Sequence, residues 1–141
     1  MIDWAAIDSA IAKAQGAPFA GERRTRLGGG SINTAYRIEN AERAYFVKLN
    51  RGEREAMFAA EAAGLAELAQ AVGLRVPCVI AQGRAGTHAY LVLEHIALHA
   101  LSPAAMTRLG EALADMHGIV AARYGFERDN TIGTSAQPNA W

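Results

Sequence analysis

The sequence predicts an α+β fold in which an antiparallel sheet carries one long helix inserted between its strands. Helical periodicity marks residues 3–15 and 53–72, and a third helical stretch begins after Ser102. The long helix follows the third strand-like run, so helices and strands do not alternate as they do in a parallel sheet. The strand-like runs, separated by turn residues, are 19–27, 34–39, 44–49, 76–83 and 88–94.

The N-terminal helix has both of its end signals. Asp3 fits the N-cap and Gly16 fits the stop. Between them, apolar residues recur at helical spacing, namely Trp4, Ile7, Ile11 and Ala14. Pro18 then starts the extended run 19–27.

The long helix at 53–72 carries a glutamate in the middle of its apolar stripe. The stripe consists of Met57, Gly64, Leu65, Leu68 and Val72. A glutamate placed among these residues is costly unless it meets a cation. We therefore expect Glu61 to pair with Lys48 on the preceding strand; the alternative is that Glu61 reaches solvent at the edge of the stripe.

The second half of the chain starts with a predicted hairpin, residues 76–83 and 88–94. Cys78, the single cysteine, precedes an apolar run and is expected to be a buried thiol. Ser102 and Pro103 start the next helix, which extends to about Gly118. Its expected apolar stripe is Met106, Leu109, Leu113, Met116 and His117. The tail from residue 124 has turn chemistry and little periodicity.

Size and charge limit the classes of function. A chain of 141 residues with 51% hydrophobic residues is one domain, or one domain and the beginning of another. Its formal net charge of zero gives no electrostatic reason to expect nucleic acid or an anionic membrane as a partner. The apolar runs are much shorter than the ~20 residues that span a membrane. Asp3 stands where a signal peptide would have a basic residue, so we expect a cytoplasmic protein.

A glycine-rich turn followed by a strand with a lysine is the main indication of function. Gly28, Gly29 and Gly30 allow the backbone to approach a ligand closely, so that amide groups can point at anionic oxygens. Lys48 on the next-but-one strand adds a cation for nucleotide phosphates, as in kinase-like sites. The glycines alone fit a simple tight turn equally well.

Two other groups of polar residues carry less weight. The four histidines (His88, His95, His99 and His117) lack a compact metal-binding spacing, and no metal site is expected from them. Asp129 and Asn130 suggest side-chain to backbone bonds that shape a loop.

Several motifs together make the chain resemble the N-terminal part of a fructosamine kinase (ketosamine-3-kinase), within the aminoglycoside phosphotransferase-like and protein-kinase-like group. The resemblance covers residues from about 22 to the last. The motifs from residue 124 onward are the most specific to the family. The motifs are GGGSIN (28–33), FVKLN (46–50), AAEAAGL (59–65), LVLE (91–94), LADMH (113–117), YGF (124–126), DNTIG (129–133) and QPNAW (137–141).

The resemblance implies a role for each matching residue. It implies a protein-kinase-like N-lobe at 1–96 and, at 97–141, the hinge and first helix of a C-lobe. The implied reaction transfers the γ-phosphate of ATP, with Mg²⁺, to the 3-hydroxyl of a sugar ketoamine. The implied nucleotide site comprises Gly28, Gly29, Gly30 and Ser31 over the phosphates, Lys48 held by Glu61, and Glu94 and His95 at the adenine hinge. Asp129 and Asn130 would edge the acceptor pocket.

The sequence departs from the family pattern at two places. Ser31 stands where many members have a redox-controlled cysteine, so thiol regulation is excluded at this position. The family's His-Gly-Asp segment and its metal-binding aspartate do not occur, since His117 and Gly118 are followed by Ile119. We therefore assign no catalytic residue and no metal ligand, and expect no useful turnover from this chain alone.

Three hypotheses remain open. The first is the nucleotide-binding lobe of a fructosamine-kinase-like enzyme, and the second is a non-catalytic kinase-like module that binds nucleotide or associates with itself. Either leaves apolar surface uncovered, which favours a homo-oligomer through residues 98–106 and 124–141. Trp141 would also need a partner to pack against. A plain α+β scaffold with an accidental glycine turn is the third.

Overall fold

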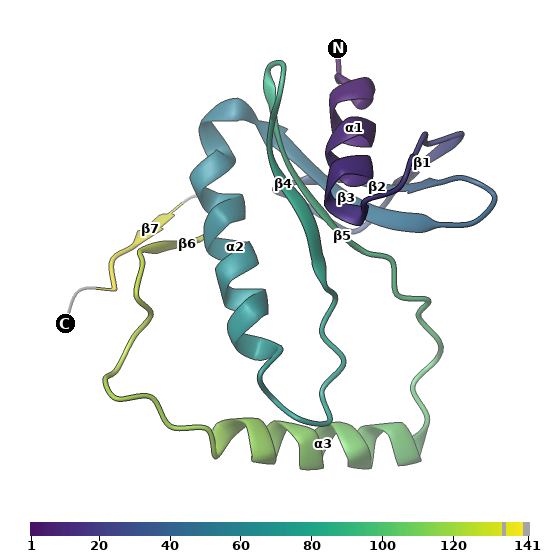
Figure 1. The fold of residues 1–141 in the computed structure, drawn as a ribbon. Coiled ribbons are helices and arrows are strands. Elements are labelled where there is room, and N and C mark those ends of the chain that lie inside the picture. Colours follow the sequence, from purple (N-terminus) through teal and green to yellow (C-terminus); the bar gives the residue numbers. More distant parts are fainter. Residues whose placement is uncertain (134, 140–141) are drawn as a thin grey trace.

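The computed structural model describes residues 1–133 and 135–139 and has a five-stranded antiparallel sheet between two helices (Figure 1). Residues 134, 140 and 141, including Trp141, lie outside the described part. The sheet order is β1-β2-β3-β5-β4, and a separate two-stranded sheet follows near the end of the chain. The prediction of an antiparallel α+β fold with a helix inserted after the third strand is confirmed.

The elements have the following bounds. The helices are α1 (Trp4–Gln15), α2 (Glu55–Leu68) and α3 (Pro103–His117), with a 3-10 turn at Gly52–Arg54. The strands are β1 (Arg23–Leu27), β2 (Thr34–Glu39), β3 (Ala44–Arg51), β4 (Val79–Ala85), β5 (His88–Glu94), β6 (Asn130–Ile132) and β7 (Ser135–Gln137).

Helix α1 covers one face of the sheet and has the predicted end signals. The Asp3 carboxylate accepts a hydrogen bond from the backbone N–H of Ala6, and Gly16 ends the helix in the left-handed conformation. Ile7 and Ile11 are fully buried against the alternate residues of β3 and β5 that point to this face. The sheet residues of this cluster are Ile38, Tyr45, Val47, Leu49, Ala85, Tyr90 and Val92.

Helix α2 covers the opposite face, but the predicted apolar stripe is wrong in detail. The residue that anchors the helix is Phe58, which packs with Ala62 against Leu91 and Leu93. Val72, predicted on the buried side, is 87% exposed because the helix ends at Leu68. Phe58 is the bulkiest apolar side chain of the helix, and its burial rotates the buried face away from the predicted one.

Two strands begin later than the extended runs predicted for them. In the run 19–27, only Arg23–Leu27 joins the sheet. β4 begins at Val79 and not at residue 76, so Cys78 lies before the strand and is exposed. The prediction of a buried structural thiol is therefore wrong: Cys78 lies directly before β4, an edge strand whose first residue, Val79, is exposed as well.

Helix α3 begins at the predicted cap but lies apart from the sheet (Figure 1). The Ser102 hydroxyl accepts a hydrogen bond from the N–H of Ala105, and Pro103 occupies the first turn. Its apolar stripe is largely exposed, with Met106 at 53% and Leu109 at 38%. No helix in residues 1–133 and 135–139 is both long and apolar enough to cross a membrane.

The end of the described chain forms a hairpin that the sequence analysis did not predict. β6 pairs with β7, and Figure 1 shows this hairpin beside α2 and away from the five-stranded sheet. Each strand has only three residues. This length is too short for the alternation of polar and apolar residues to be recognised.

Candidate functional site

The predicted pair between Lys48 and Glu61 is present. Lys48 Nζ lies 2.7 Å from both Oε1 and Oε2 of Glu61. The two side chains are 22% and 30% exposed, so the pair is partly screened by water. An ammonium group has three N–H donors, and two of them are used here. One donor of Lys48 is left for another acceptor.

The neighbouring apolar residues place these two side chains together. Along β3, Tyr45, Val47 and Leu49 are buried, most deeply Val47, so Lys48 points to the other face, toward α2. On α2, Phe58 packs on that same face of the sheet, and Glu61 follows it at i+3. Glu61 therefore lies at the flank of the buried face, and not in its middle as the sequence suggested.

The glycine run forms an open connection between β1 and β2. Gly28–Ser31 is exposed, and a Cβ added at Gly28 or Gly29 would meet no atom within 4 Å. Gly29 has φ +104°, a conformation that favours glycine. A Cβ at Gly30 would lie only 3.0 Å from the Asn33 carbonyl oxygen. The backbone here is thus free of side chains on its open side, which suits close approach of a ligand.

Glu94 and His95 lie where the sheet ends. β5 finishes at Glu94, and residues 95–102 lead without helix or strand to α3. The Glu94 carboxylate pairs with the Arg75 guanidinium and accepts a hydrogen bond from the N–H of Cys78 at 3.3 Å. The N–H of Glu94 donates to the Cys78 carbonyl at 2.9 Å. These contacts fix Glu94 at the end of the sheet, and the role of Glu94 and His95 at an adenine hinge stays a prediction.

Asp129 and Asn130 make the loop contacts that their residue types suggested. Asp129 Oδ1 accepts a hydrogen bond from the N–H of Asn139 at 2.8 Å, and Asn130 Oδ1 accepts one from Thr131 at the same distance. Neither residue meets Lys48 or the glycine run in these contacts. Their role at an acceptor pocket stays a prediction.

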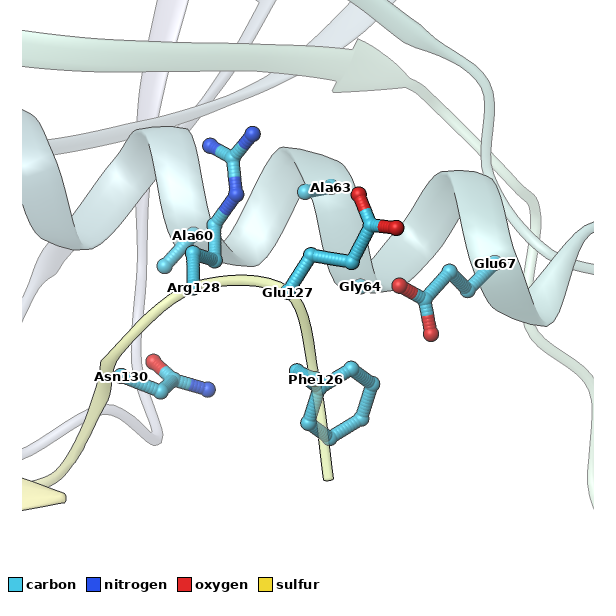
Figure 2. Close-up of a pocket in the computed structure, with 8 residues that line it drawn as sticks. All are labelled: Ala60, Ala63, Gly64, Glu67, Phe126, Glu127, Arg128 and Asn130. Carbon is cyan, nitrogen blue, oxygen red and sulfur yellow. The ribbon is translucent and has the colours of Figure 1, made fainter. Parts of the chain in front are cut away.

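A small cavity of about 130 Å³ lies between α2 and the segment 126–130 (Figure 2). Figure 2 shows Glu127 and Glu67 near Gly64, while the Arg128 side chain extends across α2. The Arg128 guanidinium donates to the carbonyl oxygen of Ala59, close to Glu61 along the helix, at 3.4 Å. Sequence reasoning did not identify Arg128, because a single arginine in a turn-rich tail carries no periodic signal.

The described residues hold no cluster of three or more His, Cys, Asp or Glu side chains able to bind a metal ion. A phosphotransferase usually holds Mg²⁺ through carboxylates in addition to the nucleotide phosphates. We assign none of the described residues as an Mg²⁺ ligand, and no step below is routed through the metal.

Together, a glycine turn and a strand lysine paired with a helix glutamate resemble the nucleotide-binding lobe of kinase-like phosphotransferases. The sequence model of the family described as "Fructosamine kinase" matches residues 3–141. The chain belongs to the fructosamine kinase family.

Individual relatives agree with this assignment. A probable ketoamine kinase of Synechocystis sp. is 39% identical over 139 residues, which cover 98% of this chain and 47% of the relative. The chloroplastic protein-ribulosamine 3-kinase of Arabidopsis thaliana is 38% identical over 118 residues, covering 82% and 36% respectively. The chain spans about half the length, or less, of the curated relatives it matches.

A solved structure extends the likeness to the fold. The crystal structure of a Haemophilus somnus protein named as a fructosamine-3-kinase matches this chain with a TM-score of 0.89 at 31% identity. The match covers 96% of this chain and 46% of that one. The five-stranded antiparallel sheet and its helices thus correspond to the N-terminal region of such a structure.

Proposed function

We propose that this chain is the ATP-binding lobe of a ketosamine-3-kinase-like phosphotransferase. The observation that carries the proposal is the Lys48–Glu61 pair on the face of the sheet that α2 covers. Two N–H groups of Lys48 bind Glu61, and the third is directed to an α- or β-phosphate oxygen. Exposed backbone amides of Gly28–Ser31 supply further donors to the phosphates.

The proposed reaction moves the γ-phosphate of ATP to the 3-hydroxyl of a sugar ketoamine. Family membership and the ketoamine kinase relatives support this substrate class. In the proposed reaction, Lys48 and the glycine run bind and orient the nucleotide. The groups that would orient the hydroxyl and hold Mg²⁺ are the family's His-Gly-Asp segment with its downstream asparagine and a later metal-binding aspartate, and this sequence does not contain them. We expect the chain alone to bind ATP without useful turnover.

The proposed lobe boundary lies near residue 96. The sheet ends at Glu94, and the segment 95–102 leaves it toward α3, which lies apart from the sheet (Figure 1). In this proposal, residues 1–96 are the kinase-like N-lobe, and residues 97–141 hold the hinge and the first helix of a C-lobe. The adenine then contacts the backbone at Glu94 and His95, and Asp129 and Asn130 edge the acceptor pocket. A cytoplasmic location also stays a prediction.

A second candidate is a non-catalytic lobe that associates with a second copy of itself. The observation that favours it is a set of exposed apolar side chains on and around α3, which we call the junction surface. Its members are Leu98, Leu101, Met106, Leu109, Leu113, Ile119, Val120, Tyr124 and Phe126. An apolar patch of this kind is typical of an interaction surface.

The proposal is tested by titrating the 141-residue chain with ATP and, separately, with adenosine in a calorimeter. A site built on phosphate contacts predicts that ATP binds at least about tenfold more tightly than adenosine, since hydrogen bonds to charged groups contribute about 1.5–3 kcal/mol. Equal affinity for the two ligands would contradict the phosphate role of Lys48 and of the glycine run.

A further inference from the structure

One side chain joins the strand that carries Lys48 to the glycine loop. Asn50 lies two residues after Lys48 on β3, so both side chains leave the same face of the sheet. Asn50 Nδ2 donates to the carbonyl oxygen of Ile32 at 3.1 Å and to Oδ1 of Asn33 at 2.7 Å. Both acceptors belong to the segment that leads from the glycines into β2.

These two bonds divide the loop into a held limb and an open limb. The held limb is Ile32–Asn33, tied to β3, and Gly30 folds back closely on the Asn33 carbonyl. The open limb is Gly28–Gly29, whose Cβ positions face empty space. The open limb is thus anchored at two ends, by the held limb and by Leu27 of β1, which pairs with Ala35.

The chemistry of the contact requires a donor at position 50. A backbone carbonyl such as that of Ile32 can only accept a hydrogen bond. The orientation of the Asn50 amide is also set, because its Oδ1 accepts the N–H of Arg51 at 2.7 Å. This leaves Nδ2 directed at the loop. Aspartate has nearly the same shape but would place oxygen against oxygen.

We propose that Asn50 is a positioning residue for the glycine loop, residues 28–33. It holds this loop at a distance from Lys48 at which the loop amides and Lys48 can bind the same phosphates. This inference rests on the proposed nucleotide site. A loop fixed before binding loses less conformational entropy when the ligand arrives. Asn50 thus raises phosphate affinity while it does not itself contact the ligand.

The first measurement needs no ligand. Backbone ¹⁵N relaxation reports the order of the Gly28, Gly29 and Gly30 amides in the wild-type chain and in the variants Asn50→Ala and Asn50→Asp. In the wild type we expect order parameters S² of about 0.85, typical of a rigid backbone. In both variants we expect the S² of these glycines to fall below about 0.6. The matched control is Asn40→Ala, which removes a side-chain cap at the other end of the β2–β3 hairpin and should leave the loop unchanged. Unchanged order in Asn50→Ala would overturn the inference.

The second measurement is ligand affinity. Asn50→Ala should raise the Kd for ATP about 3–10-fold and leave that for adenosine unchanged, because only the phosphates meet the loop. An unchanged ATP affinity would also overturn the inference. If Asn50→Ala fails to fold, Asn33→Ala removes the 2.7 Å contact without altering the sheet and should show a smaller effect of the same kind. If the wild type binds no ATP, the proposed function fails, and the relaxation data alone decide on Asn50.

Discussion

Lys48 and Glu61 show how one residue can be placed by its neighbours and still remain available for a ligand. The pair is partly exposed, and such pairs contribute little to the free energy of folding. Its value is geometric, since the carboxylate fixes the ammonium group at one position on the sheet. The sequence predicted this pair because a glutamate on an apolar helix face needs a cation nearby.

The same reasoning could not identify Asn50. An asparagine near the end of a strand is as consistent with a turn as with a functional contact. Its role depends on the loop 28–33 returning over β3, which is a tertiary contact and has no periodic signature. The glycines, in contrast, were found from the sequence because their residue type alone indicates close backbone approach.

Tyr90 provides a test at the residue scale that is independent of ligands. Burial, and secondarily the charge of Glu55, raise the pKa of Tyr90 above its usual value near 10. Above pH 10 the tyrosine of the unfolded chain ionises while the folded one keeps its proton, so the unfolded state binds fewer protons and stability falls as pH rises. We expect Tyr90→Phe to lose less stability than the wild type between about pH 9 and 11 in urea unfolding.

The control for this prediction is Tyr124→Phe, because Tyr124 is 88% exposed. The free energy of unfolding of Tyr124→Phe should depend on pH in the same way as that of the wild type. If the free energy of unfolding of Tyr90→Phe falls with pH as steeply as that of the wild type, Tyr90 ionises equally in the folded and the unfolded state, which would contradict the prediction.

At the scale of elements, α2 is fixed by one aromatic side chain. Phe58 is 1% exposed and packs against Leu91 and Leu93 on the sheet. Phe58→Ala should lower the free energy of unfolding by about 3–5 kcal/mol, from lost burial and the cavity left behind. Leu68→Ala, at the 41% exposed end of the same helix, is the control and should cost much less. Equal losses in chemical denaturation would contradict the assignment of Phe58 as the anchor.

Elements with local end signals were predicted closely, and elements fixed by tertiary packing were not. Asp3, Gly16 and Ser102 act through bonds within their own helix, so residue type and position suffice to predict them. The rotation of α2 depends on which side chain fits the sheet best. The start of β4 after Cys78 depends on where β5 ends, which local sequence does not encode.

At the scale of the whole molecule, the junction surface predicts self-association. Hydrophobic side chains on α3 stay partly exposed in the described chain, Met106 at 53% and Leu109 at 38%, and this favours pairing with a second copy. We expect light scattering after size-exclusion chromatography to give a mass above that of a monomer. Leu109→Glu combined with Leu113→Glu should shift it to a monomer.

The control is Val72→Glu, which adds a charge at an exposed position outside the junction surface. It should leave the mass unchanged. A monomeric wild type at high protein concentration would contradict the second candidate function and leave the nucleotide proposal intact.

The central claim is that Lys48 binds the phosphates of ATP. The chain has only two lysines, Lys48 on β3 and Lys13 on α1, which covers the opposite face of the sheet. The most direct measurement is therefore the calorimetric ATP affinity of Lys48→Ala and Lys13→Ala beside the wild type. We expect a loss of about tenfold or more in Lys48→Ala alone. ATP binding that is equal in all three proteins would contradict the placement of the phosphate site.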